Sequence, residues 1–285
     1  MALSATTGGE RRKRQRDSSF GYVMPALLLI AVFFIIPVLM LLVRSVLEPT
    51  PGLQNYQMLL GSTTYLRVFV NTFTVAGLVT VISVVIGFPV AWLLSIMPDR
   101  WSKLILAIIV LSMWTNLLAR TYAWMVLLQR TGVVNKTLMN LGIIDAPLAL
   151  VNNLVGVTIG MTYIMLPFVI LPMIGVLKSI DPAILRAAAL CGANKRQCFT
   201  RVLLPLSLPG VVSGALMVFV MSLGYYVTPA LLGGTSNMML AELVAQFVQS
   251  LVNWGMGGAA ALVLLIVTLL LYAVQLKYFN PDRAR

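Results

Sequence analysis

The sequence predicts an all-α integral membrane protein with six transmembrane helices. The chain of 285 residues is 60% hydrophobic and only 10% charged, which is more apolar surface than one soluble core can bury. Several apolar segments reach the length of about 20 residues that a helix needs to cross a bilayer. The alternating segments of about ten residues that are typical of a transmembrane barrel are not found.

The chain begins with a basic tail, residues 1–20, which we expect to be disordered because Ser, Thr, Gly and Arg dominate it. Its basic cluster Arg11–Arg16 precedes an apolar run, as in a signal peptide. The run from Tyr22 to Val43 is longer than the apolar core of a signal peptide, about 7 to 15 residues, and has no small-residue cleavage site. We therefore interpret it as a retained first helix, and residues 21–280 as one membrane domain.

Six segments are long and apolar enough to be spans. We expect them at about residues 22–44, 71–97, 104–128, 153–177, 207–232 and 254–276. Arg120 interrupts the third, in WTNLLARTYAW, so its outer end is expected to bend away or to be re-entrant. In the fifth, GYYVTPALLGG contains Pro229 and a glycine pair, which predict a broken outer end.

The basic residues set the expected orientation. With the amino terminus inside, the cytoplasmic side holds five Lys or Arg in the tail, two before the third span, five before the fifth and three after the sixth, fifteen of the twenty. The positive-inside rule then places both termini in the cytoplasm. The net charge of +12 is explained by this topology and by contact with anionic membrane lipid, and no nucleic acid partner is expected.

The residue types argue against catalysis. Histidine is absent and the only cysteines are Cys191 and Cys198, so a metal centre or a histidine-based triad is not expected. Two helical turns would hold these thiols about 10 Å apart in one straight helix, too far for a disulfide. No G-x-x-x-x-G-K-[ST] loop occurs, so the chain is expected to bind no cofactor and to hydrolyse no ATP itself.

The segment between the fourth and fifth spans is charged and helix-forming. Asp181 is a good cap and Pro182 a good first helical residue, and strong helix formers follow. Gly192 is expected to stop this helix. The stretch ANKRQCFTRVLL then has helical character again, until Pro205 and Pro209 close the segment. We predict a short helix, a glycine bend and a second short helix at the membrane surface, which composition alone would also fit as an interfacial amphipathic helix.

The spacing in this loop, 178–206, resembles the EAA loop of the permeases of binding-protein-dependent ABC importers. Two alanines, a glycine four positions later and a hydrophobic-x-leucine-proline ending at Pro205 match that pattern. The resemblance implies these ATPase-coupling residues: Arg186, Ala187, Ala188, Gly192, Ala193, Leu204 and Pro205. Arg186 departs from the family, which has glutamate there; the partner ATPase could present an acid or a carbonyl to it.

Other stretches, among them NYQMLL, TNLLARTYAWMVLL and GMTYIMLPFVILPM, are similar to permeases of the spermidine/putrescine type. The resemblance implies a type I importer permease fold, with a core from about Asn71 and a cytoplasmic coupling helix between helices 4 and 5. It also implies a bacterial inner membrane location and alternating access. The implied partners are two copies of an ABC ATPase that binds ATP and Mg²⁺, a sister permease in a heterodimer and a periplasmic solute-binding protein.

Polar groups within the spans are candidates for the translocation path, because burying them against lipid is costly. The predicted path residues are Asn116, Arg120, Tyr122, Tyr163, Tyr225, Tyr226 and Thr228, with Trp124, Thr158 and Thr162 as further candidates. Each could instead be structural, since Thr bonds its own helix and Tyr favours the membrane interface. For Arg120 three roles are open: snorkelling, pairing with Glu242 or repelling cations.

A polyamine is the favoured solute, recognised through aromatic faces. No Asp or Glu lies within a span, which keeps another amine-bearing or an anionic organic solute open. Two other functional classes are alternatives. A secondary transporter would be expected to carry intramembrane acids or histidines for ion coupling, which are not visible. A membrane scaffold subunit would have no transport path.

Overall fold

Five helices of the computed structural model are long and apolar enough to cross a membrane, and a bent pair supplies a sixth span. The structure describes residues 23–278, which contain no strand. The spans are Val23–Leu47, Thr63–Ile96, the bent pair Asp99–Met113 and Leu117–Asn140, Leu154–Ser179, Lys195–Leu223 and Trp254–Ala273. The predicted all-α membrane fold is therefore confirmed, whereas the basic tail predicted at 1–20 lies outside the described residues.

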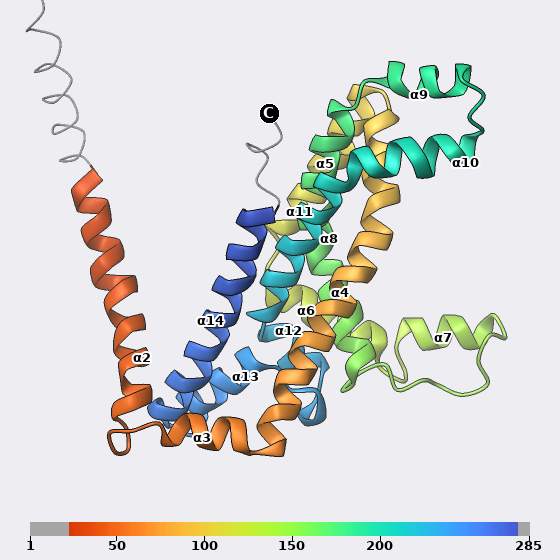
Figure 1. Ribbon diagram of the computed structural model, residues 1–285. Helices are drawn as coiled ribbons and strands as arrows, with labels where there is room; N and C mark the ends of the chain where they lie inside the picture. Colours follow the sequence, from red (N-terminus) through yellow and green to blue (C-terminus); the bar gives the residue numbers. More distant parts are fainter. Residues whose placement is uncertain (1–22, 279–285) are drawn as a thin grey trace, which may run out of the picture.

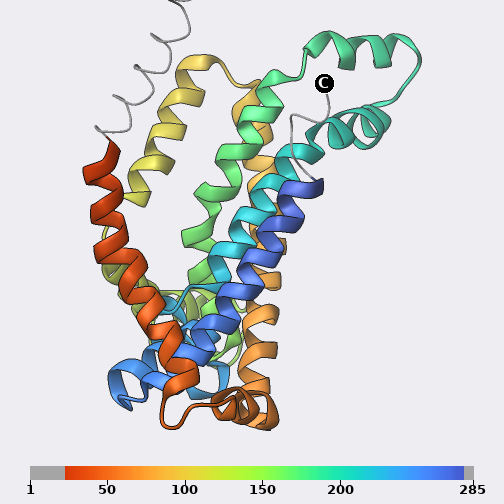
Figure 2. The same ribbon diagram turned by 60° about the vertical axis from the view of Figure 1, so that its left-hand side comes forward.

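The helices form a bundle with two distinct ends (Figures 1 and 2). Along the chain they are η1 (Ala31–Ile35), α2 (Ile36–Leu47), α3 (Gln54–Gly61), α4 (Thr63–Ile96), α5 (Asp99–Met113), α6 (Leu117–Leu128), α7 (Val133–Asn140), α8 (Leu154–Ser179), α9 (Pro182–Leu190), α10 (Lys195–Gln197), η2 (Cys198–Leu203), α11 (Leu204–Leu223), α12 (Val227–Leu232), η3 (Thr235–Asn237), α13 (Leu240–Ala245), η4 (Gln246–Ser250) and α14 (Trp254–Tyr278). We call the end from which α9 and α10 project the arm end, and the opposite one the α3 end.

The second span starts earlier than predicted. The helix α4 begins at Thr63 rather than near residue 71, because no helix breaker follows Ser62 and the added turns pack inward. Val68, in one of these turns, is buried in a small apolar cluster at the α3 end, together with Leu59 of α3 and Leu243 of α13. The extra length thus fixes the short helices of the α3 end to α4.

The third span is not the single helix predicted at 104–128. The segment Leu117–Asn140, which contains α6 and α7, is bent by 95° relative to α5. Asn116 explains the break, since its Oδ1 accepts backbone N–H bonds from Leu118 at 2.8 Å and from Ala119 at 3.2 Å. A side chain that caps a new helix in the middle of an apolar run ends the preceding one. The interruption that the sequence predicts in the segment with Arg120 therefore occurs, as a bend just before α6, and in Figure 1 α6 lies at a depth between the two ends of α14.

The core of the bundle is built by α4, α8 and α11, which pack on one another. Met161, Met165 and Val169 of α8 are fully buried there. At Gly214 of α11, a Cβ would lie 3.0 Å from the carbonyl oxygen of Val169, so a side chain there would push the two helices slightly apart. Because lipid tails are as apolar as the core side chains, close packing of this kind stabilises helix contacts in membranes.

The fifth span is longer than the predicted 207–232 at one end and shorter at the other. An unbroken helix runs from Lys195 to Leu223 through α10, η2 and α11, so Pro205 and Pro209 do not close the preceding segment. In the π-helical turn η2, the N–H of Leu204 bonds to the carbonyl of Phe199, five residues back. Such a turn changes the bonding pattern before the proline, and the helix continues. The predicted break at the other end occurs at Gly224, before α12.

The first span is attached mainly at the α3 end. There α2 packs on α14, and Arg44 lies over the Trp254 ring, 5.3 Å from its centroid. Asn55 of α3 fixes the connecting turn, because its Nδ2 donates to the carbonyls of Ser45 at 2.8 Å and Glu48 at 2.6 Å. Toward the arm end, α2 diverges from α14 (Figure 1).

Candidate functional site

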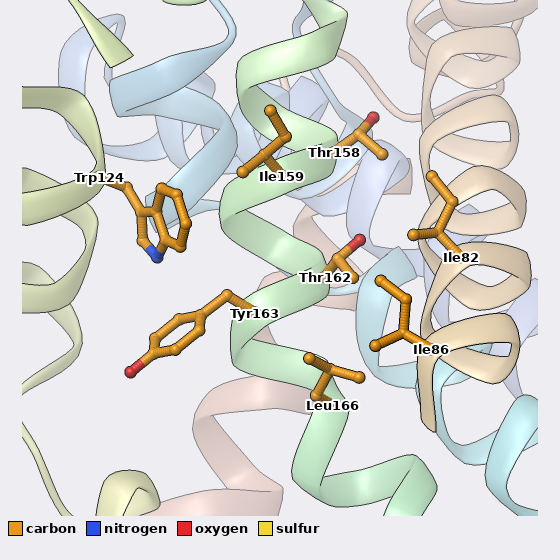
Figure 3. A pocket seen from close by; sticks show the side chains of 8 residues that line it. All are labelled: Ile82, Ile86, Trp124, Thr158, Ile159, Thr162, Tyr163 and Leu166. Carbon is orange, nitrogen blue, oxygen red and sulfur yellow. The ribbon is translucent and has the colours of Figure 1, made fainter. Parts of the chain in front are cut away.

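A pocket with a volume of about 330 Å³ opens between α4, α6 and α8. Its lining residues are Ile82, Ile86, Trp124, Thr158, Ile159, Thr162, Tyr163 and Leu166. Figure 3 shows Ile82 and Ile86 on α4, facing the side of α8 that carries the two threonines. The break in the third span supplies the remaining wall, because it brings α6 and its Trp124 beside α8.

An aromatic pair forms one wall of the pocket. The rings of Trp124 and Tyr163 have centroids 5.6 Å apart and planes at 60°, an edge-to-face arrangement. Tyr163 remains 38% exposed, so part of its ring is open to a ligand. Aromatic faces attract ammonium groups through cation–π interactions, and the isoleucines opposite suit a hydrocarbon chain.

The polar groups of the pocket are hydroxyls. Thr158 donates its Oγ1 hydrogen to the Leu154 carbonyl at 2.8 Å, the usual bond of a helical threonine to its own backbone. Thr162 differs, because its buried Oγ1 has no hydrogen-bond partner. The α8 wall therefore offers the Thr162 hydroxyl as a polar group without a hydrogen-bond partner.

The predicted path residues are only partly brought together. Tyr163 lines the pocket, as do the further candidates Trp124, Thr158 and Thr162. Asn116 caps α6 and has that structural role. Tyr122 and Tyr226 are 49% and 44% exposed, and neither lines the pocket.

Thr228 connects the two broken spans. Its hydroxyl lies 3.3 Å from that of Thr121, and both side chains are fully buried. Thr121 is on α6 and Thr228 on α12, so the bond joins the break in the third span to the break in the fifth. Beside it, Leu232 of α12 packs into the main core with Val157 and Met161 of α8. This contact holds the wall that carries Trp124.

Arg120 and Glu242 do not form the pair considered from the sequence. Within the described chain no ion pair involves either residue, and the Nε of Arg120 and the Oε2 of Glu242 are buried without a hydrogen-bond partner. Glu242 lies in the short helix α13, and its burial raises the pKa of its carboxyl above the ordinary value. Arg120, one turn into α6, is half-buried.

The second candidate site is the projecting arm, the name we give to α9, α10 and η2. Asp181 caps α9 by accepting the Ala183 N–H at 2.8 Å, and Gly192 turns the chain with φ +86°. This φ suits glycine and strains other residues. A capping box between Asn194 and Gln197 then starts α10, as expected for a sharp helix start.

The implied coupling residues occupy different surfaces of the arm. Arg186, Ala187 and Gly192 are exposed, and Ala188 and Ala193 are half-buried. Leu204 and Pro205 lie at the start of α11, in the unbroken helix. Both are exposed on the side of the bundle. Arg186 and Ala187 therefore belong to the exposed surface of α9, and Gly192 to the turn that follows it. Leu204 and Pro205 belong to the fifth span itself.

The arm is joined to the bundle by an aromatic cluster that the sequence reading missed. Phe199 of η2 packs against Phe88 and Trp92 of α4. The apolar pocket residues Ile82, Ile86, Ile159 and Leu166 were missed as well. An apolar residue that faces a pocket looks the same in sequence as one that faces lipid. For Phe88 and Phe199 a weak signal existed, since both lie near the predicted cytoplasmic ends of spans.

Comparison with known proteins identifies the family of this chain. Residues 57–285 match the model of the family described as "Binding-protein-dependent transport system inner membrane component". The chain is 34% identical over 226 residues to the spermidine/putrescine transport system permease protein PotB of Haemophilus influenzae, covering 79% of this chain and 78% of that protein. The PotB of Escherichia coli K12 is 32% identical, with 81% and 82% covered.

A solved structure has the same fold. The chain superposes on a chain of the bacterial alginate ABC transporter, crystallised with a periplasmic protein bound to an alginate pentasaccharide, with a TM-score of 0.73. The alignment covers 94% of this chain and 98% of the other at 18% sequence identity. The similarity therefore shows a shared arrangement of helices.

Proposed function

We propose, from the premise that the chain belongs to the binding-protein-dependent transport system inner membrane components, that its solute is a polyamine such as putrescine or spermidine. As a family member, the chain is an inner-membrane permease subunit of an ABC importer, and a separate subunit hydrolyses ATP. The observation that carries the solute assignment is the 34% identity to a spermidine/putrescine permease across 79% of this chain.

The pocket supports this solute chemically. A polyamine has ammonium groups separated by short hydrocarbon chains. The Trp124 and Tyr163 rings suit the ammonium groups, and Ile82 and Ile86 suit the hydrocarbon. No carboxylate lines the pocket, so binding would be weak and the solute would be released readily. Selectivity would then rest with the solute-binding protein.

The assembly we propose has four kinds of component. The family implies an ATPase and a solute-binding protein. Two copies of the ATPase, each holding ATP and Mg²⁺, would act on this chain and on a sister permease, with which it forms a heterodimer. Both termini and the arm end would face the cytoplasm, and the α3 end the periplasm. The helix α9 and the last described turns of α14 lie at the arm end (Figure 1), the side that the basic residues predict to be cytoplasmic.

The unbroken helix Lys195–Leu223 suggests how ATP would drive transport. An ATPase docked on the arm would move α10 when it closes on ATP. Because α10, η2 and α11 are one helix, this movement would tilt the fifth span and shift α12 at its other end. Through the Thr121–Thr228 contact, α6 and the Trp124 wall would follow. The pocket would then alternate between the two sides, provided that the ATPase docks differently in the two states.

A second solute class is favoured by one observation. Arg120, with its buried and unpaired Nε, would suit a solute that carries a carboxylate as well as an amine. Such a solute would need Arg120, whereas a polyamine would be repelled by it. Uptake by an Arg120→Gln variant therefore separates the two classes.

Uptake measurements test the proposal. A strain that lacks this gene should lose ATP-dependent uptake of labelled putrescine or spermidine and regain it with the wild-type chain. Trp124→Ala and Tyr163→Ala should raise the KM for uptake, each by about fivefold, as for a lost cation–π contact of about 1 kcal/mol. Trp114→Ala, at a tryptophan that is 86% exposed, is the matched control and should leave the KM unchanged. Normal polyamine uptake in the deletion strain, with another amine no longer taken up, would reject the polyamine assignment.

A further inference from the structure

The helix α7 and the loop that follows it project from the side of the bundle. We call residues 133–153 the α7 hairpin. In Figure 1 it extends sideways, away from α8, at a depth between the two ends of α14 and nearer the end that begins at Trp254. Because Trp254–Ala273 is long and apolar enough to cross a membrane, the α7 hairpin lies at membrane depth.

A buried asparagine holds the α7 hairpin in shape. The side chain of Asn135 is fully buried. Its Nδ2 donates to the carbonyls of Gln129 and Leu148, each at 3.0 Å, and its Oδ1 accepts the N–H of Leu148 at 2.8 Å. These bonds connect α7 to the chain before it and to the far side of the loop. The hairpin is thus preorganised, which lowers the entropic cost of binding a partner.

The tip of the α7 hairpin is apolar. Leu141 and Ile143 are 67% and 63% exposed, and Met139 and Leu148 are exposed as well. A group of exposed apolar side chains on one segment is typical of a surface that another molecule covers. Contact with water would be unfavourable for these side chains.

The backbone of the tip excludes lipid as the cover. From Ile144 to Asn152, the N–H of Leu148 is the only one with a hydrogen-bond partner among residues 23–278. An unsatisfied backbone group in hydrocarbon is costly, so irregular backbone at membrane depth occurs only where protein or a water-filled cavity covers it. The apolar side chains disfavour the cavity, and a protein surface is the remaining cover.

Asp145 sets the charge of that protein surface. Its side chain is exposed at the tip and takes part in no ion pair within the described chain, not even with Lys136 of the same hairpin. A carboxylate without a partner is costly at membrane depth, so the covering surface needs a Lys or Arg opposite it. The partner is therefore a membrane-embedded protein with an apolar surface, hydrogen-bond acceptors and a basic side chain.

We infer that the α7 hairpin docks on the sister permease, and that a basic residue of the sister permease faces Asp145. The inference rests on the proposed heterodimer and assigns to it a surface and a chemistry. The hairpin projects sideways at membrane depth, which is the direction of a neighbouring permease. A solute-binding protein would instead approach from beyond the α3 end.

Photo-cross-linking in cells that express the whole importer identifies the cover. With benzoylphenylalanine at Ile143, we expect an ultraviolet-dependent product that contains peptides of the sister permease. The same analogue at Leu60, which is exposed on α3, is the matched control and should give little of this product. A product with the solute-binding protein or with a second copy of this chain would overturn the inference, as would the absence of any protein product.

Charge reversal tests the pairing of Asp145. Asp145→Lys should lower the amount of sister permease that co-purifies with the tagged chain by at least about tenfold, as for a broken buried charge pair. Asp145→Glu should retain the sister permease. Arg67→Glu, at an exposed cation on α4 near the α3 end, is the control and should have no effect. Asn135→Ala should also weaken the association, because the hairpin loses its shape.

Two further measurements separate association from folding and from the proposed function. Asp145 makes no ion pair within the described chain, so Asp145→Lys purified alone should unfold at the wild-type temperature. Wild-type recovery of the sister permease with Asp145→Lys would overturn the inference and leave the proposed function intact. If the wild-type chain co-purifies with no second permease, the proposed heterodimer fails and the inference fails with it.

Discussion

Phe199 packs edge-on against Phe88, with ring centroids 6.0 Å apart and planes at 84°. Trp92 adds a second contact to Phe199 at 5.7 Å. Phe199 belongs to η2 of the arm, and both partners belong to α4. The arm is therefore connected to two core helices, to α11 through the continuous backbone and to α4 through these rings.

Phe199→Ala should uncouple ATP hydrolysis from transport. Loss of the Phe199 ring removes two aromatic contacts with α4, each with a stabilising free energy of about 0.5–1.5 kcal/mol. The exposed face of α9 is left unchanged. In proteoliposomes, we expect fewer solute molecules imported per ATP hydrolysed. The control is Phe33→Ala, at a side chain that is 76% exposed. An unchanged ratio for Phe199→Ala would show that α4 does not receive the movement through these rings.

Gly192→Pro should abolish ATP-driven uptake while the protein stays in the membrane. Proline holds φ near −65°, whereas Gly192 has φ +86° and its N–H donates to the Ala189 carbonyl at 3.0 Å. Gly192→Ala should have a milder effect, at a conformational cost of about 1–2 kcal/mol. Gly175→Ala, in α8 with open space around the new methyl group, is the control for uptake. Normal uptake by Gly192→Pro would reject a role for the bend in coupling.

Thr121→Val and Thr228→Val should destabilise the protein together by less than the sum of their separate effects. Each change removes the same interhelical bond, so a double-mutant cycle should give a coupling energy of about 0.6 kcal/mol, typical of such bonds in membranes. Thermal unfolding in detergent measures it. Thr268→Val replaces a hydroxyl bonded only to carbonyls of its own helix and should show no coupling with Thr228→Val. Strictly additive effects would mean that the bond does not form.

Cys191 allows the orientation to be measured without adding a cysteine. This thiol is exposed on the arm and Cys198 is half-buried. If the arm end faces the cytoplasm, a membrane-impermeant maleimide should label Cys191 only after the inner membrane is opened. Cys191→Ser should remove the signal. Labelling of intact spheroplasts would reverse the proposed topology.

Hydropathy was sufficient to predict the spans, because the cost of exposing polar groups to lipid acts on each segment separately. Local chemistry decided the boundaries that were mispredicted. The capping bonds of Asn116, a predicted path residue, end α5 and start α6. Pro205 and Pro209 were treated as helix ends, but the π-helical turn η2 lets the helix continue. The break before α6 and the continuous helix through Pro205 both depend on particular hydrogen bonds. The residue types in these segments allow such bonds but do not make them necessary.

The candidate sites differ in how far the sequence determines them. Asp181, Pro182 and Gly192 predicted the α9 turn, since caps and glycine bends are local. The pocket depends instead on the contact of α4, α6 and α8, which are far apart in sequence. Aromatic and hydroxyl residues could be proposed for it, as Tyr163 and Thr162 were. Its isoleucine wall could not, because nothing local distinguishes it from the lipid-facing surface.

The unbroken helix from Lys195 to Leu223 has a consequence for ATP consumption when no solute is present. A stiff element transmits force in both directions, and energetic coupling between two binding events is reciprocal. If nucleotide closure on the arm raises the affinity of the permease for a solute-loaded binding protein by a given factor, binding of that protein must favour nucleotide closure by the same factor. A break in this one helix would therefore weaken both effects together.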